Sequence, residues 1–353
     1  MSWADFGSLV KEIAFGLAAL GVDRLSCVSI FSNNSHMWVA ADIATICNGG
    51  VSVPIYPTSS QADIEFIIDN SQAKIMFVQN DALLKKVLSG RDKIPHLEKI
   101  ILLNAPAGGR SLHELTESLG LPNNQTLVTT IEEVLALGRE LKSEEPDLID
   151  TRIAQTELSD LATIIYTSGT TGTPKGAALS HANVKAIVDD MRTTLPIDER
   201  DVYLSYLPLS HVFERICGEF YWMHCGGEYA FAESIETMAK NLAEINPTML
   251  LVVPRVLDRI YAKVKSGMDG AAGSRRLLIN WALSVGKDSV QSKANGRPVS
   301  SLLKLKHLIA EKLVFKKLRE KIGPRLRMVV SGGAPATAHS IEFFNAIGIT
   351  TLE

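Results

Sequence analysis

Apolar positions in this chain follow two patterns, short β-branched runs and longer stretches with a helical period. The first helical stretch, 3–20, ends at Gly21 and places these apolar residues on one face: Phe6, Leu9, Val10, Ile13, Leu17 and Leu20. The apolar runs predict buried strands at 27–31, 51–55, 74–79 and 99–103. Between them, helices are predicted at 35–47 and 61–70, followed by a short helix capped by Asp81. Strands that alternate with helices imply parallel βαβ units.

The alternation continues in the second half of the chain. One strand is expected to end at Pro208, and the others are predicted at 248–253, 328–330 and 349–352, with helices at 181–194 and 233–243. Between the halves, the charged segment 141–155 predicts an exposed connector. We therefore predict an α/β fold of layered parallel βαβ sheets, with a first subregion over 1–145 and a second over 156–353.

Composition narrows the class of protein. The chain has 353 residues, 46% of them hydrophobic, and a net charge of -3, which is typical of a globular protein and gives no footprint for nucleic acid. Its four cysteines form no CxxC pair, so reduced thiols in a cytoplasmic protein are expected rather than disulfides or a metal site. No apolar run approaches the roughly 18 residues that cross a bilayer, so membrane contact, if it occurs, is peripheral.

The most informative stretch is YTSGTTGTPKG, from Tyr166 to Gly176, which follows the apolar run 161–165. Its glycines allow backbone amides to approach a ligand, its hydroxyl side chains are donors, and Lys175 adds the only charge. A row of free N–H groups forms an anion-binding concavity, so polyphosphate oxygens are the expected ligand.

Two other interpretations of this stretch fit less well. Composition alone suits a flexible linker, but the stretch lies between two core segments, and Ser180 is positioned to cap the helix at 181–194. A Walker A loop does not fit, because Pro174 and Gly176 stand where that motif needs glycine and Ser/Thr.

This stretch, followed by Ser180 and His181, resembles the phosphate loop of the adenylate-forming (AMP-binding) enzymes. The resemblance implies that ATP phosphates bind the loop, with Lys175 and Thr170 acting in catalysis. The nucleotide-binding residues that it implies are Thr167, Ser168, Gly169, Thr170, Thr171, Gly172 and Lys175.

A second motif, LPLSHVFER, contains Ser210 and His211 at the expected start of a helix. A lone histidine there is more often a capping or core residue. The string, however, resembles the long-chain fatty acid–CoA ligase branch, in which this histidine lies beside the acyl and phosphate sites. Glu214 and Arg215 are interpreted as a structural pair. Trp222, Met223, Tyr229 and Phe231 are core residues or, with a fatty acid substrate, part of a tunnel wall.

Two later segments carry weaker signals. Gly332, Gly333, Ala334 and Pro335 follow a buried strand, either as a tight turn or, as the resemblance implies, as a border of the adenine and acyl sites. The basic stretch 302–327 has an apolar side and is either a solvated helix face or a contact for anionic lipid or coenzyme A phosphates.

The resemblance covers nearly the whole chain, and both ends fall inside the family pattern. The chain stops at Glu353, before the Thr-Glu motif, the ribose-binding Asp and the C-terminal domain with its lysine, so we expect a partial N-terminal domain that is inactive alone. The implied activity is that of a long-chain fatty acid–CoA ligase using ATP, coenzyme A and Mg²⁺. A fatty acyl-AMP ligase and a non-catalytic nucleotide or acyl binder are the alternatives.

Overall fold

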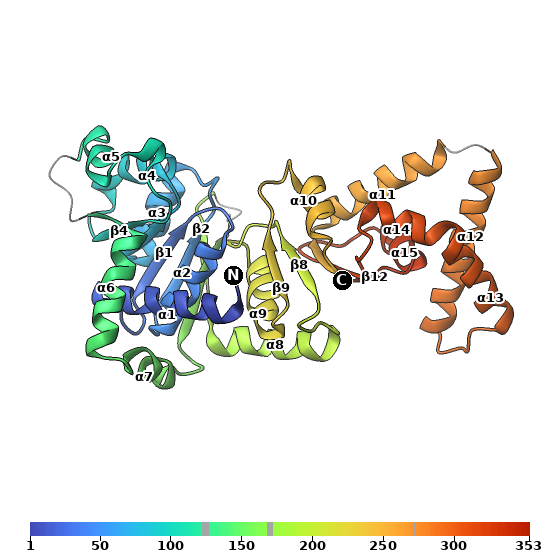
Figure 1. Cartoon of the computed structure of the whole chain (residues 1–353), viewed down its shortest axis with the longest axis horizontal. Helices are drawn as coiled ribbons and strands as arrows, with labels where there is room; N and C mark the ends of the chain where they lie inside the picture. The colour runs from blue at the N-terminus through green and yellow to red at the C-terminus, as the bar shows by residue number, and fades with distance from the viewer. Residues whose placement is uncertain (122–126, 168–171, 271–272) are drawn as a thin grey trace. The chain divides into compact units, whose positions relative to one another are not determined.

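The computed structural model describes residues 1–121, 127–167, 172–270 and 273–353. They form two compact units. Unit 1 comprises Met1–Leu195 and Pro208–Phe220, and unit 2 comprises Pro196–Leu207 and Tyr221–Glu353 (Figure 1). The expected first subregion, 1–145, lies within unit 1, whereas the expected second subregion is divided between the two units.

Unit 1 is built around a seven-stranded sheet in its described residues, with strand order β5-β4-β3-β1-β2-β6-β7. Its strands are β1 (Cys27–Phe31), β2 (Val51–Ile55), β3 (Ile75–Val78), β4 (Lys99–Leu102), β5 (Val128–Thr130), β6 (Leu161–Thr167) and β7 (Lys175–Ser180). Neighbouring strands are parallel except for β6 and β7. The predicted α/β fold with parallel βαβ units is therefore confirmed.

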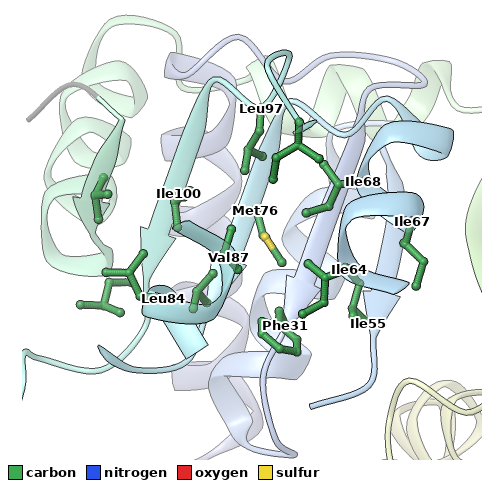
Figure 2. Close-up of a cluster of buried hydrophobic side chains, with 14 of the residues drawn as sticks. Phe31, Ile55, Ile64, Ile67, Ile68, Met76, Leu84, Val87, Leu97 and Ile100 are labelled. Atoms are coloured by element: carbon green, nitrogen blue, oxygen red, sulfur yellow. The ribbon is translucent and has the colours of Figure 1, made fainter. Parts of the chain in front are cut away.

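The helices of unit 1 cover both faces of this sheet. They are α1 (Trp3–Ala19), α2 (His36–Cys47), α3 (Gln61–Ser71), α4 (Asp81–Leu88), α5 (Leu112–Ser118), α6 (Ile131–Glu144), α7 (Leu148–Gln155) and α8 (His181–Thr194), with 3-10 turns at Arg91–Lys93 and Ala107–Gly109. Because β2 and β3 lie on opposite sides of β1, right-handed crossovers place α2 and α3 on opposite faces. Figure 2 shows the core beneath α3 and α4, where Phe31, Met76 and Ile100 meet Ile64 and Leu84.

Two helices on the other face approach unusually closely. A Cβ on Gly138 of α6 would lie 2.1 Å from the backbone oxygen of Glu12, and one on Gly16 of α1 would lie 2.3 Å from that of Val134. Only glycine permits this packing of α1 against α6.

One prediction about unit 1 is wrong and another is met only in part. The segment 141–155 is largely exposed, as expected of a connector, but it is helical, since α6 runs to Glu144 and α7 starts at Leu148, and Ile149 is buried. The charges that suggested a connector lie on exposed helix surface around the break at Pro146. The short helix α4 is capped by Asn80 rather than Asp81, since the Asn80 side chain accepts the Leu83 N–H.

Unit 2 contains a parallel five-stranded sheet in its described residues, with order β12-β11-β10-β8-β9. Its strands are β8 (Val202–Ser205), β9 (Glu228–Phe231), β10 (Met249–Val252), β11 (Met328–Ser331) and β12 (Thr350–Leu352). The helices are α9 (Tyr221–Cys225), α10 (Met238–Ile245), α11 (Pro254–Asp269), α12 (Gly273–Ala294), α13 (Ser301–Ala310), α14 (Lys316–Ile322) and α15 (Ala338–Ala346), and the π-helical segment Glu311–Phe315 joins α13 to α14.

Several boundaries in unit 2 differ from the predicted ones. β8 ends at Ser205 rather than Pro208, and α10 starts at Met238 rather than 233, after a turn in which Ser234 and Thr237 bond to each other. Hydroxyl side chains that satisfy their own backbone compete with helix formation, which explains the late start.

An ion pair joins two distant segments of unit 2. Arg327, at the start of β11, donates from Nε and Nη2 to the two carboxylate oxygens of Asp201 over 3.0 and 2.5 Å. Thr248 Oγ1 also donates to Asp201, over 2.7 Å. Every oxygen of this carboxylate therefore has a donor, although the Arg327 side chain is 41% exposed.

No helix in the described part of the chain is long and apolar enough to span a bilayer.

Candidate active site

The predicted phosphate loop is closed by a β-hairpin. β6 and β7 pair antiparallel, and their register sets Thr167 directly opposite Lys175. The hairpin thus brings together Thr167, which contributes a hydroxyl group, and Lys175, which contributes an ammonium group. The remaining predicted loop residues, Ser168, Gly169, Thr170 and Thr171, lie outside the described residues.

Each described loop residue has a distinct local role. Gly172 has φ +87°, a conformation that L-residues rarely adopt, and it is exposed. Gly176 is needed for packing, because a Cβ there would lie 2.8 Å from Ile164 Cγ2 and 3.1 Å from the ring of Tyr166. The Tyr166 hydroxyl donates to Asn70 Oδ1 over 2.7 Å and so fixes the end of β6.

Lys175 is exposed at the start of β7, and its ammonium group forms no ion pair with any residue that the structure describes. Helix α8 follows directly, with Ser180 as its cap through a bond from Asn183 N–H, as predicted. The hairpin and the capped helix fix the backbone on the exit side of the loop.

His211 lies in a turn just before the helical segment that contains the π-helix Glu214–Phe220. The Phe213 N–H donates to His211 Nδ1 over 3.2 Å, so the ring proton of the neutral imidazole sits on Nε2. Burial lowers the pKa of His211, which favours this neutral form at pH 7. The side chain is therefore set to donate a hydrogen bond from Nε2.

A buried charged cluster, formed by Asp42, Thr163, Arg215 and Glu219, anchors the π-helix to two other elements. Arg215 donates to Asp42 Oδ1 of α2 and to Thr163 Oγ1 of β6, each over 2.5 Å. Both Arg215 and Asp42 are fully buried. Because Thr163 lies four residues before Thr167 on the same strand, this cluster ties the His211 segment to the strand that leads into the loop.

Glu219 makes this cluster unusual. Its nearest carboxylate oxygen is 4.0 Å from Arg215 Nε, and neither of its oxygens has a hydrogen-bond donor among the described residues. Burial, and then the Asp42 carboxylate, raise the pKa of Glu219 well above its usual range. The raised pKa favours the protonated form of Glu219, which can donate to the unpaired Oδ2 of Asp42.

Sequence reasoning missed this cluster. It interpreted Arg215 as the partner of its neighbour Glu214, whereas the partner of its Nη2 is Asp42, 173 positions away. One feature of the sequence could have revealed the cluster. Asp42 lies in the largely apolar helix 36–47, and a buried acid needs a partner.

The remaining predicted residues, Gly332, Gly333, Ala334 and Pro335, form the turn after β11 in unit 2. Gly333 has φ +85°, and the segment from 333 to 335 is exposed. The turn is held at both ends, because Gly332 N–H bonds to Val252 O of β10 over 3.1 Å and Ala336 N–H bonds to Glu353 over 3.0 Å. It lies at the carboxyl edge of the sheet, where α/β proteins bind ligands.

Trp222, a candidate tunnel residue, belongs to the core. Its ring is fully buried, its Nε1 donates to Glu228 O over 3.0 Å, and its centroid lies 5.1 Å from that of Tyr203. Tyr229 and Phe231, 4.7 Å apart between ring centroids, are only partly buried. Of these residues, only the partly buried ones offer apolar surface to a ligand.

Within the described ranges, no group of three or more His, Cys, Asp or Glu residues could hold a metal ion.

Comparison with known sequences identifies the family of the chain. A family model described as AMP-binding enzyme matches residues 1–353. The chain is 33% identical to the long-chain-fatty-acid–CoA ligase ACSBG2 of Xenopus laevis, covering 100% of this chain and 46% of that protein. It is 30% identical to the long-chain-fatty-acid–CoA ligase FadD15 of Mycobacterium tuberculosis, covering 99% and 54%. The chain thus spans about half the length of the curated relatives it matches.

Solved structures give the same fold. The adenylation domain of a carboxylate reductase from Mycobacterium chelonae superposes with a TM-score of 0.73 at 20% identity, covering 99% of this chain and 50% of that one. The N-terminal domain of FACL13 from Mycobacterium tuberculosis, crystallised with an inhibitor, gives 0.61 at 18% identity, with 99% and 67% covered. The fold is that of the N-terminal domain of adenylate-forming enzymes, and the chain belongs to the AMP-binding enzyme family.

Proposed function

We propose that this chain is the nucleotide- and acyl-binding part of a long-chain fatty acid–CoA ligase. In the proposed reaction, a fatty carboxylate oxygen attacks the α-phosphorus of ATP, and the bond to pyrophosphate breaks. The thiol of coenzyme A then loses its proton and attacks the acyl carbonyl, releasing AMP. The relatives named above support the substrate class, since both are long-chain-fatty-acid–CoA ligases.

The observation that carries the proposal is the hairpin that sets Thr167 opposite Lys175. An exposed hydroxyl and an exposed ammonium group on paired strands at the two ends of a glycine-containing loop suit the oxygens of a polyphosphate leaving group. His211, neutral and with its proton on Nε2, suits hydrogen bonding to the fatty carboxylate or the acyl phosphate.

We also propose a cytoplasmic location. All four cysteines are unpaired, and burial raises the pKa of the Cys47 thiol to about 11 and that of Cys217 to about 12. Both thiols are partly buried, and a raised pKa keeps them protonated and less reactive, in keeping with a reducing compartment.

The test compares the parent chain with Lys175→Ala in calorimetric titrations with ATP and with AMP. Lys175→Ala should weaken ATP binding about tenfold or more, because a charged hydrogen bond contributes roughly 1.5 to 3 kcal/mol, while AMP binding changes far less. Lys185→Ala is the matched control, since Lys185 is also exposed in unit 1 and pairs only with Asp189 of the same helix. Equal ATP affinity of Lys175→Ala and the parent would remove the loop from the proposal.

The reaction itself is then identified by activity assays. This chain and a longer chain that includes the rest of the protein are assayed side by side. Pyrophosphate release should depend on hexadecanoate more than on acetate, and a thioester should form when coenzyme A is added. Adenylate without a thioester would identify a fatty acyl-AMP ligase. Nucleotide binding without pyrophosphate release by the longer chain would identify a non-catalytic binder. Higher turnover with acetate would overturn the long-chain assignment.

A further inference from the structure

One helical run in unit 2, Ser301 to Ile322, exposes an apolar face. α13, the π-helical segment and α14 follow one another without a break. Within this run, the inner face is buried in the core through Ala310, Val314, Phe315 and Leu318. The outer face exposes large side chains at spacings of three, three, one and four residues: Leu302 (63%), Leu305 (56%), Leu308 (65%), Ile309 (44%) and Leu313 (43%). This spacing aligns them along one side of a helix.

The same run carries an excess of positive charge. Residues 301–322 contain seven lysines and arginines against two acidic residues, whereas the rest of the chain contains 29 against 37. Lys304, Lys306, Lys312 and Lys316 are exposed beside the apolar face, and none of them has an ion-pair partner among the described residues. Glu311, the acidic residue in their midst, is already bonded to Arg319 over 3.0 Å. The positive charge is therefore free to meet an external anion.

We propose that this apolar face, together with its four flanking lysines, is a docking surface for an anionic phospholipid bilayer. Leucines that enter the boundary of the acyl chains, beside lysines that reach the headgroups, form the usual chemistry of a helix lying in a membrane interface. A protein partner fits less well, because lysine is depleted and aromatic residues are enriched in the cores of protein interfaces. The proposal is independent of the adenylation chemistry and requires no segment that crosses the membrane.

The first measurement is flotation of the chain with vesicles of phosphatidylcholine alone and of phosphatidylcholine mixed with phosphatidylserine. Binding should occur to the phosphatidylserine vesicles and should weaken as salt is added, because exposed charges are screened. Absence of binding to these vesicles, or equal binding to both kinds, would overturn the proposal.

Two double variants separate the apolar and charged contributions. Leu305→Ser with Leu308→Ser should weaken vesicle binding on the order of tenfold or more. Lys306→Glu with Lys312→Glu should weaken binding by roughly fivefold for each lysine, and only to the phosphatidylserine vesicles. The matched controls are Leu158→Ser with Ile235→Ser, whose side chains are 57% and 68% exposed, and Lys142→Glu with Lys185→Glu in unit 1.

The controls should leave binding unchanged, and an unchanged melting profile would show that each variant is folded. If the leucine variant and its control lose binding equally, the face is not the docking surface. Sedimentation tests whether a second copy of the chain, rather than a bilayer, covers this face. A parent chain that dimerises, does not float with vesicles, and becomes monomeric in the leucine variant would assign this face to a second copy instead.

Discussion

Each unit contains an arginine–aspartate pair that joins segments far apart in the sequence, and the two pairs differ in exposure and in charge balance. In unit 1, the fully buried Arg215 faces two carboxyl groups, Asp42 and Glu219. In unit 2, Arg327 is 41% exposed, and two of its nitrogens donate hydrogen bonds to the single carboxylate of Asp201. The first cluster is neutral only if one acid keeps its proton, whereas the second is neutral with both groups ionised.

This difference gives the two clusters opposite pH dependence. Burial raises the pKa of Asp201, but bonds from Arg327, Thr248 and the Asp198 amide outweigh that effect, so its pKa is lowered overall. The pKa of Glu219, in contrast, is raised by burial and by Asp42. The contribution of Asp201 to stability is present above the ordinary aspartate pKa and is lost as the pH falls through its lowered value. That of Glu219 is present below the ordinary glutamate pKa and is lost as the pH rises.

The largest effect is expected from Arg215→Met. The buried Asp42 carboxylate would lose its counter-ion, and breaking such a pair typically lowers the free energy of unfolding by about 3–5 kcal/mol. Hydrogen exchange of α2 and β6 measures this in unit 1 separately from unit 2. Adding Asp42→Asn should recover part of the loss, because it removes the uncompensated charge. A loss below about 1 kcal/mol in the single variant would mean that water reaches the cluster.

A smaller effect is expected from Arg327→Met. Asp201 would keep its bonds from Thr248 and from the Asp198 amide, and the arginine is partly solvated, so the loss in unit 2 should be about 1–2 kcal/mol. Urea unfolding, with exchange of β8 and β11 as the local readout, measures it. Arg200→Met is the control, because Arg200 is 83% exposed and its removal should leave the stability of unit 2 nearly unchanged. Equal losses in Arg327→Met and Arg215→Met would contradict the comparison.

The smallest change in the free energy of unfolding at any single pH is expected from Glu219→Gln. The sign of this change is the most informative, because the variant is expected not to lose stability. Glutamine is neutral at every pH and can donate to Asp42, so the variant should be at least as stable as the parent at pH 7. Its advantage should shrink as the pH falls toward the ordinary glutamate pKa of about 4.3, by up to about 1.4 kcal/mol per pH unit.

Asp201→Asn gives the opposite sign and serves as the comparison. This variant should be less stable than the parent at pH 7, and its deficit should shrink as the pH falls through the lowered pKa of Asp201. Unfolding curves collected across pH values test both variants. A Glu219→Gln variant that is less stable than the parent at pH 7 would show that Glu219 is ionised in the folded protein.

Much of the local structure could be predicted because its causes lie within a few residues. β1 and β2 have the predicted bounds, and α8 begins after Ser180 because that side chain caps its own helix. The predictions failed where neighbouring signals compete: Asp81 was expected to cap α4, yet the preceding Asn80 accepts the Leu83 N–H. The candidate site was found only in part. The loop motif and His211 are visible in the sequence, whereas the buried cluster that ties them together is not.

By itself, the sequence determined the alternation of strands and helices, the glycine-rich loop with Lys175, and the family resemblance, since each depends on residue types at short spacings. Only the tertiary structure decided the strand order, the pairing of Thr167 with Lys175 and the partner of Arg215. It also decided which apolar residues of the helical run from Ser301 are buried and which remain exposed. The physical reason is that a buried charge takes its partner from whatever the fold packs beside it, and Asp42 reaches Arg215 only after α2, β6 and the π-helix have assembled.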